Sequence, residues 1–139
     1  MVIDQSLIGR TSSPEIHEVR EEEVRRFMGA TEDPALQSGA PLTYAPPTFP
    51  TTFRSSRHSI PGLELDGSKM QLLHGEQQFS YTRPLRIGEQ VSCVTRVADV
   101  RQRSGRSGEM TFVILEMEGM DSQQQPIFSA RSTLIVRQK

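Results

Sequence analysis

The sequence has little of what marks a secreted, membrane or nucleic-acid-binding protein. Its 139 residues include one cysteine, Cys93, which excludes an intrachain disulfide and fits a reducing, cytoplasmic location. No apolar run approaches the roughly 18 residues of a membrane span, and we expect neither a membrane segment nor a signal peptide. The 16 basic and 17 acidic side chains give a formal net charge of -1, which argues against a nucleic-acid partner.

Familiar catalytic motifs are also missing. The sequence has no glycine-rich phosphate loop, dinucleotide fingerprint or nucleophile elbow. His17, His58 and His74 lack the spacing of a local metal site. The 35% of hydrophobic residues provide one modest core, which a partner surface would complete.

The N-terminal part of the chain favours a helix followed by a long connection. Apolar residues at near-helical spacing predict a capped helix over 13–27, whose charged run 21–26 faces water with local Glu to Arg pairs. Prolines and glycines then predict an irregular segment over 31–66. Within it, Phe49 and Phe53 would share the apolar face of a short helix.

From residue 70 onward the pattern has a period of two, which predicts strands. Four alternating sets stand out: Gln77-Phe79-Tyr81, Val91-Cys93-Thr95-Val97, Phe112-Ile114 beside Val113-Leu115-Met117, and Phe128-Ala130-Ser132-Leu134-Val136. The connections 83–89, 104–108 and 121–126 are short enough for hairpins, so the predicted sheet is antiparallel. A helix first and a sheet afterwards predict the α+β class.

Two polar side chains are candidates for proton transfer. Asp33 follows the predicted helix and either caps a turn or acts as a catalytic carboxylate. His74 enters the first predicted strand and is either a hydrogen-bonded structural histidine or an acid–base group. The residue pattern alone leaves both interpretations open.

Three stretches together resemble the N-terminal-type domain of the MaoC-like dehydratase family. They are Phe27-Met28-Gly29-Ala30-Thr31-Glu32-Asp33-Pro34, Tyr44-Ala45-Pro46-Pro47-Thr48-Phe49-Pro50, and Leu73-His74-Gly75-Glu76-Gln77-Gln78-Phe79 continued through 83–89. The resemblance implies a single hot-dog domain over 1–139, in which an antiparallel sheet wraps a short central helix at 48–55. It also implies that two such units pair so that their sheets are continuous.

The same resemblance implies a reaction. The family acts on enoyl or 3-hydroxyacyl thioesters of CoA or acyl carrier protein in fatty acid metabolism, as (R)-specific hydratases or dehydratases without a metal or redox cofactor. Catalytic members are similar to Asp-x-Asn-Pro-x-His, and here that pattern keeps Asp33 but has Ala35 and Ser38 in place of Asn and His. A serine does not titrate near neutrality.

A second part of the family's site is altered. Catalytic relatives offer a backbone N–H at the start of the central helix to the thioester oxygen, where charge develops. This chain has Pro46 and Pro47 at that entry, and neither carries an N–H, so Thr48 is the first possible donor. The resemblance therefore implies a substrate-binding subunit. It would form either a homodimer or a heterodimer with a catalytic hot-dog subunit that supplies Asp and His.

Three alternatives stay open: a self-sufficient hydratase that uses Asp33 with His74, an acyl-CoA thioesterase, and a non-catalytic acyl-thioester-binding or pairing subunit. The candidate substrate-binding residues are Pro47, Thr48, Phe49, Phe53, Arg54, Gly75 and Arg86. Arg54, Arg57 and Arg86 would either meet the carrier's phosphates or simply solvate the surface. Phe49, Phe53, Phe79 and Tyr81 would form core or acyl-facing surface.

Overall fold

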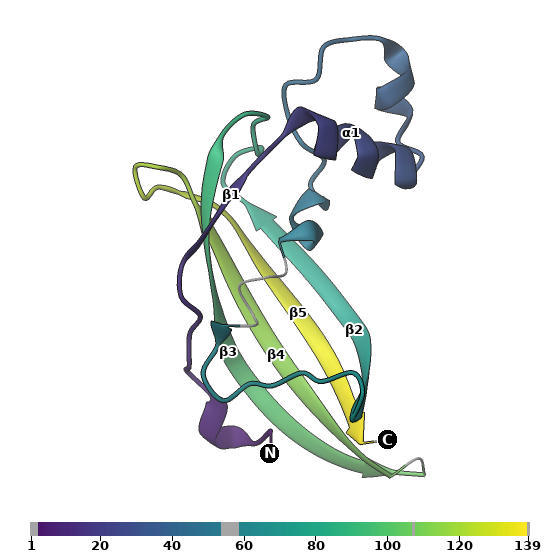
Figure 1. Cartoon of the computed structure of the whole chain (residues 1–139), viewed down its shortest axis with the longest axis vertical. Helices are drawn as coiled ribbons and strands as arrows, with labels where there is room; N and C mark the ends of the chain where they lie inside the picture. Colours follow the sequence, from purple (N-terminus) through teal and green to yellow (C-terminus); the bar gives the residue numbers. More distant parts are fainter. Residues whose placement is uncertain (1–2, 54–58, 107, 139) are drawn as a thin grey trace.

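The computed structural model describes residues 3–53, 59–106 and 108–138, in which an antiparallel sheet of order β1-β3-β4-β5-β2 dominates (Figure 1). Its strands are β1 (Glu15–Glu18), β2 (Met70–Tyr81), β3 (Gln90–Gly105), β4 (Gly108–Met120) and β5 (Pro126–Gln138). The helical elements are η1 (Gln5–Leu7), α1 (Glu21–Ala30), η2 (Pro34–Ser38) and η3 (Phe49–Thr52), the three η elements being 3₁₀ helices.

The four strands predicted from the period-two pattern are confirmed, and each is longer than its alternating set. β3 with β4 and β4 with β5 form two of the three expected antiparallel hairpins. Alternate residues of β3 turn into the core: Val91, Cys93 and Val97 are 0% exposed and Thr95 is 4% exposed. This alternation places one face of the sheet against the interior and leaves the other toward solvent.

The predicted hairpin at 83–89 is wrong. β2 pairs with β5, and β3 lies two strands further across the sheet. The connection instead crosses the end of the molecule, where the Ile87 N–H donates to the Thr43 carbonyl and the Gly88 N–H donates to the Val19 carbonyl. Turn residues such as Pro84 and Gly88 mark the reversal of the chain but do not determine which strands then pair.

The predicted helix over 13–27 is also wrong in its first half. Glu15–Glu18 is the edge strand β1, in register with the start of β3 through Glu15 opposite Cys93. α1 begins at Glu21, after Arg20 in an extended conformation. Hydrogen bonds offered by the unpaired edge of β3 outweigh the weak helical spacing of this segment, whereas the Arg25 to Glu21 ion pair at 3.2 Å confirms the expected solvated helix face.

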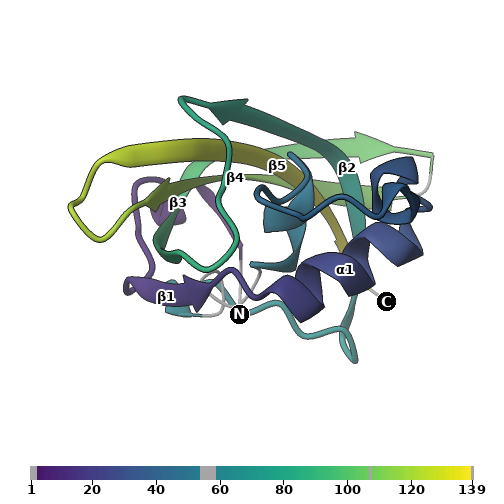
Figure 2. The same ribbon diagram turned by 90° about the horizontal axis from the view of Figure 1, so that it is seen from above.

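The sheet curls around the segment that carries η3, and α1 packs on the far side of that segment (Figure 2). η3 is shorter than the predicted helix over 48–55, because the helical conformation ends at Phe53. Residues 54 and 55 lie outside the described residues. The expected apolar face is confirmed, since the rings of Phe49 and Phe53 meet edge to face with centroids 5.7 Å apart.

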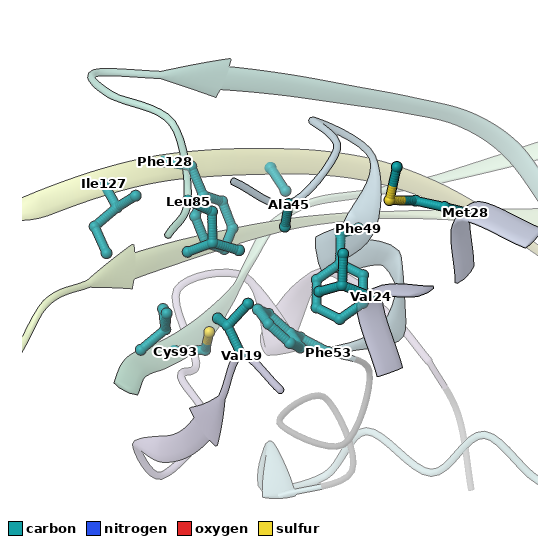
Figure 3. Close-up of a cluster of buried hydrophobic side chains, with 12 residues drawn as sticks. Val19, Val24, Met28, Ala45, Phe49, Phe53, Leu85, Cys93, Ile127 and Phe128 are labelled. Carbon is teal, nitrogen blue, oxygen red and sulfur yellow. The ribbon is translucent and has the colours of Figure 1, made fainter. Parts of the chain in front are cut away.

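The buried apolar side chains form two clusters on the inner face of the sheet. The helix-end core contains α1, η3 and one end of the strands, with Phe49, Phe53 and Phe128 at its centre (Figure 3). The far core contains Val97, Val113 and other residues from the opposite end of the strands. No helix of the described residues is long and apolar enough to cross a membrane.

Candidate functional site

A cavity of about 430 Å³ lies on the inner face of the sheet, where the two cores come apart. Phe53 and Ala130 of the helix-end core and Leu115 of the far core line it. Its other lining residues are Pro50, Thr51, His74, Gly75, Glu76, Gln77, Thr95, Met117 and Ser132. A volume in this range is typical of sites for small ligands.

The register of the sheet explains why these side chains meet. One cross-strand row runs Thr95, Met117, Ala130 and Phe79, and the next runs Val97, Leu115, Ser132 and Gln77. Side chains in such rows share one face of the sheet. The floor of the cavity therefore consists of neighbouring positions on four strands, and polar residues interrupt an otherwise apolar surface there.

An irregularity in β2 adds His74 to this wall. His74 is in register with Leu134 and Gln77 with Ser132, and the pairing shifts between His74 and Glu76. The extra residue is Gly75, which allows both His74 and Gln77 to line the cavity although they lie three positions apart. A Cβ on Gly75 would lie 3.2 Å from the Ile135 side chain, so a larger residue here requires Ile135 to shift by a few tenths of an ångström.

Two polar side chains of the cavity, Gln77 and Ser132, have donor and acceptor groups that the described residues do not use. Neither Gln77 nor Ser132 has a side-chain hydrogen bond within the described part of the chain. Gln77 is exposed and Ser132 is half-buried. Amide and hydroxyl groups in such positions serve both as donors and as acceptors for a ligand.

The structure places Asp33 in a capping role and does not bring it to the cavity. Its carboxylate accepts the N–H of Ala35 at 3.0 Å and so caps η2. Ser38, at the position of the family's histidine, donates its hydroxyl to the Ala35 carbonyl at 2.9 Å. Among the residues that line the cavity, His74 is present and Asp33 is not, so the structure does not bring the two candidate acid–base residues into one cavity.

A second histidine, His17, packs behind Phe53, one of the residues that line the cavity, and the sequence did not single it out. His17 of β1 stacks on Phe53, with ring centroids 4.5 Å apart and planes 11° from parallel. Its Nε2 atom has no hydrogen-bond partner in the described residues, and the Glu15 carboxylate at 3.8 Å is too distant for a hydrogen bond. Burial lowers the pKa of His17 below its usual 6.5, while Glu15 and Glu23 oppose the shift.

A second, smaller hollow of about 330 Å³ holds Pro47, the one candidate substrate-binding residue that lines it. The Tyr81 hydroxyl donates to the Pro47 carbonyl, and burial raises the pKa of Tyr81 to about 12, so the phenol stays protonated near neutrality. Arg83 lies beside them, with a guanidinium that pairs with Glu89 at 2.7 Å. This region is held by hydrogen bonds and ion pairs between loops.

The remaining candidates are scattered. Phe49 is 1% exposed in the helix-end core, whereas Thr48 is exposed before η3, where the Phe49 N–H donates to the Pro46 carbonyl. Arg86 is exposed and forms a β-bridge with Tyr44, away from the lining of the cavity. Arg54 and Arg57 lie outside the described residues. Of the candidates, the structure brings together Phe53, His74 and Gly75.

Sequence reasoning missed Thr95, Gln77 and Ser132 as cavity residues, although the signal was present. Each is a polar member of an alternating set whose other members form core, such as Val97 beside Thr95. A polar residue on a buried face marks either a satisfied hydrogen bond or a site. Among the described residues, no group of three or more His, Cys, Asp or Glu side chains is arranged to hold a metal ion.

Comparisons with known proteins extend the geometric description. Residues 6–130 match the family model described as FAS1-like, dehydratase domain region. The chain is 32% identical over 151 residues to a UPF0336 protein of Saccharopolyspora erythraea, covering 99% of this chain and 93% of the relative. It is 33% identical to a UPF0336 protein of Streptomyces coelicolor, covering 99% of this chain and 97% of the relative.

Solved structures agree on the fold. The crystal structure of the HadBC (3R-hydroxyacyl-ACP dehydratase) complex from Mycobacterium tuberculosis has a TM-score of 0.70 at 19% identity, covering 93% of this chain and 96% of that chain. The ChsH1-ChsH2 complex from the same organism scores 0.65 at 17% identity, covering 90% and 83% of the two chains. A MaoC-like dehydratase from Rhodospirillum rubrum scores 0.64 at 14% identity, covering 95% and 93%. The hot-dog fold and the resemblance to MaoC-like dehydratases are thereby confirmed.

Proposed function

Because this chain belongs to the family of FAS1-like dehydratase domain regions, we propose that it is the acyl-thioester-binding subunit of an (R)-specific enoyl-thioester hydratase or 3-hydroxyacyl-thioester dehydratase. Its substrate would be an acyl group on CoA or acyl carrier protein. The proposal treats residues 1–139 as one hot-dog unit that needs no metal or redox cofactor. A partner hot-dog subunit would supply the catalytic Asp and His.

The observation that carries this proposal is the incomplete acid–base motif between Asp33 and Ser38, where a serine stands in place of the family's histidine. Hydration of an enoyl thioester requires a group that moves a proton near neutrality, which a serine hydroxyl engaged with the Ala35 carbonyl does not supply. Asp33 caps η2 and is not among the residues that line the cavity. A carboxylate without its histidine leaves half of an acid–base pair.

Pairing follows from the same incomplete site. β2 is a 12-residue strand at one edge of the sheet, so its outer backbone groups are available to a second sheet. Two structurally similar proteins, HadBC and ChsH1-ChsH2, are complexes by description. Edge-to-edge pairing at β2 would set a partner's catalytic residues beside the strand that carries His74 and Gln77.

The proposal is tested by measuring hydration of a short enoyl-CoA by the purified chain alone and with a hot-dog subunit that carries the intact Asp-x-Asn-Pro-x-His pattern. We expect acyl-CoA binding without turnover by the chain alone, and turnover in the complex. Asp33→Asn is the matched variant, since asparagine also caps a helix. Turnover by the chain alone that Asp33→Asn abolishes would instead identify a self-sufficient hydratase.

The same assay separates the thioesterase alternative. A hydratase changes the conjugated enoyl thioester and leaves the thioester bond intact, whereas a thioesterase releases free thiol. Thiol release measured in parallel is therefore expected to stay at the rate of the uncatalysed reaction. Rapid thiol release by the chain or the complex would contradict the hydratase assignment.

A further inference from the structure

The composition of the cavity wall distinguishes among acyl groups. Around the site where the two cores separate, β4 contributes the apolar side chains of Leu115 and Met117, and Phe53 contributes its ring from the end of η3. The side formed by β2 and β5 contributes the polar pair Gln77 and Ser132, which stand opposite each other in the register. Thr51, Thr95 and Ala130 also line the cavity, so its surface mixes apolar and polar groups, and Gln77 with Ser132 is the adjacent polar pair on β2 and β5.

A plain alkyl chain fits such a cavity poorly. It would cover Gln77 and Ser132 and exclude water from them without offering a hydrogen bond, and neither side chain has a hydrogen-bond partner among the described residues. Sites with unused hydrogen-bonding groups discriminate strongly against ligands that lack the matching atom. Gln77 and Ser132 therefore favour a ligand that places an oxygen atom beside them.

Charge in the lining limits what that oxygen can be. The Glu76 carboxylate accepts a hydrogen bond from Gln78 on the outer face of the sheet, and the described lining residues include no lysine or arginine to pair with a carboxylate in the ligand. The Gln77 amide and the Ser132 hydroxyl are neutral groups that both donate and accept, and they suit a hydroxyl or keto oxygen. A neutral oxygen function satisfies them, whereas a carboxylate would find no lysine or arginine partner among the described lining residues.

We propose that the acyl group recognised in this cavity carries a hydroxyl or keto oxygen distant from the thioester, and that Gln77 and Ser132 select it. The inference rests on the proposed function, because it assigns a substrate class to the same acyl-binding site. Met117, Leu115 and Phe53 then pack against the carbon chain, and the polar pair binds its oxygen. Gly75 is a positioning residue, since its bulge is what turns both His74 and Gln77 into the cavity.

The test is calorimetric binding of octanoyl-CoA, 8-hydroxyoctanoyl-CoA and the dicarboxylic octanedioyl-CoA to the chain. We expect the hydroxyacyl thioester to bind about tenfold more tightly than octanoyl-CoA, and the dicarboxylic one to bind no better than octanoyl-CoA. The double variant Gln77→Leu, Ser132→Ala should abolish the preference, so that octanoyl-CoA binds at least as well as the hydroxyacyl thioester.

The matched control is Gln78→Leu with Ser129→Ala, which makes the same changes on the outer face of the same two strands. It should keep the preference of the native chain. Two results would overturn the inference and leave the proposed function standing. One is equal binding of octanoyl-CoA and 8-hydroxyoctanoyl-CoA by the native chain, and the other is a preference that survives in Gln77→Leu, Ser132→Ala. No binding of any thioester would overturn both.

Discussion

The imidazole of His17 connects a residue-scale defect to the cavity. It stacks on Phe53, which lines the cavity, and its Nε2 atom is buried without a hydrogen bond in the described residues. An unsatisfied buried nitrogen costs roughly 1–3 kcal/mol, so this histidine lowers the free energy of unfolding while it supports the ring of Phe53. A phenylalanine would keep the ring stacking and remove the unsatisfied nitrogen.

His17→Phe should therefore stabilise the chain, and more so in acid. Burial lowers the pKa of His17 in the folded chain. On acidification His17 therefore takes up a proton at about pH 6.5 in the unfolded chain and only at a lower pH in the folded chain. Stability from neutral His17 is present above that pH and is lost as the pH falls toward the lower folded pKa. Urea unfolding near neutrality should show a gain of about 1 kcal/mol, and a larger gain near about pH 5.

Glu15→Gln is the control for this pH dependence. Glu15 raises the pKa of His17 against the effect of burial, so removal of its charge should steepen the loss of stability in acid. Identical pH profiles for the native chain and His17→Phe would contradict the assignment of the acid loss to this side chain.

At the scale of the element, α1 lacks a side-chain cap at its start. Its N-cap residue is Arg20, in an extended conformation that suits a cap, and the side chain makes no capping hydrogen bond. The first turn holds Glu21, Glu22 and Glu23, which already favour the positive end of the helix dipole. Only the cap itself is missing.

Arg20→Ser should stabilise the chain by about 0.5–1 kcal/mol. A serine at the N-cap, with Glu23 three residues later, completes a capping box. The exposed Arg20 to Glu18 ion pair that is lost contributes little. Urea unfolding measures the change, with Arg26→Ser inside the helix as a control that should gain nothing. A lower stability of Arg20→Ser would show that the arginine does more than its ion pair.

Elements of strong periodicity could be predicted from the sequence, and elements set by their neighbours could not. Alternation at Val91 to Val97 predicted β3 because one face of that strand is buried. Glu15–Glu18 became a strand only because β3 offers it an edge, which no local pattern encodes. The cavity was partly predictable: the residue pattern singled out Phe53 and His74 and the resemblance added Gly75, whereas Ser132 and Thr95 required the cross-strand register.

On the scale of the whole molecule, the sheet has two unequal edges. β1 is four residues long and β2 is twelve, and each carries an exposed apolar side chain, Ile16 at 70% and Leu73 at 47% exposure. An edge strand of that length is a template for pairing with another chain. The length of β2 favours pairing there, and the same strand carries the cavity residues His74 and Gln77.

Leu73→Lys should weaken pairing, whereas Ile16→Lys should not. In a pair of identical chains joined at β2, the substitution would put a lysine from each chain into the interface in place of an apolar side chain, and like charges are costly there. We expect the native chain to be a dimer in light scattering after gel filtration, and Leu73→Lys to raise the dissociation constant about tenfold or more. Ile16→Lys places the same charge at the other edge and should leave the dimer intact. Dissociation by Ile16→Lys alone would place the interface at β1, and His74 and Gln77 would then lie far from any partner's residues.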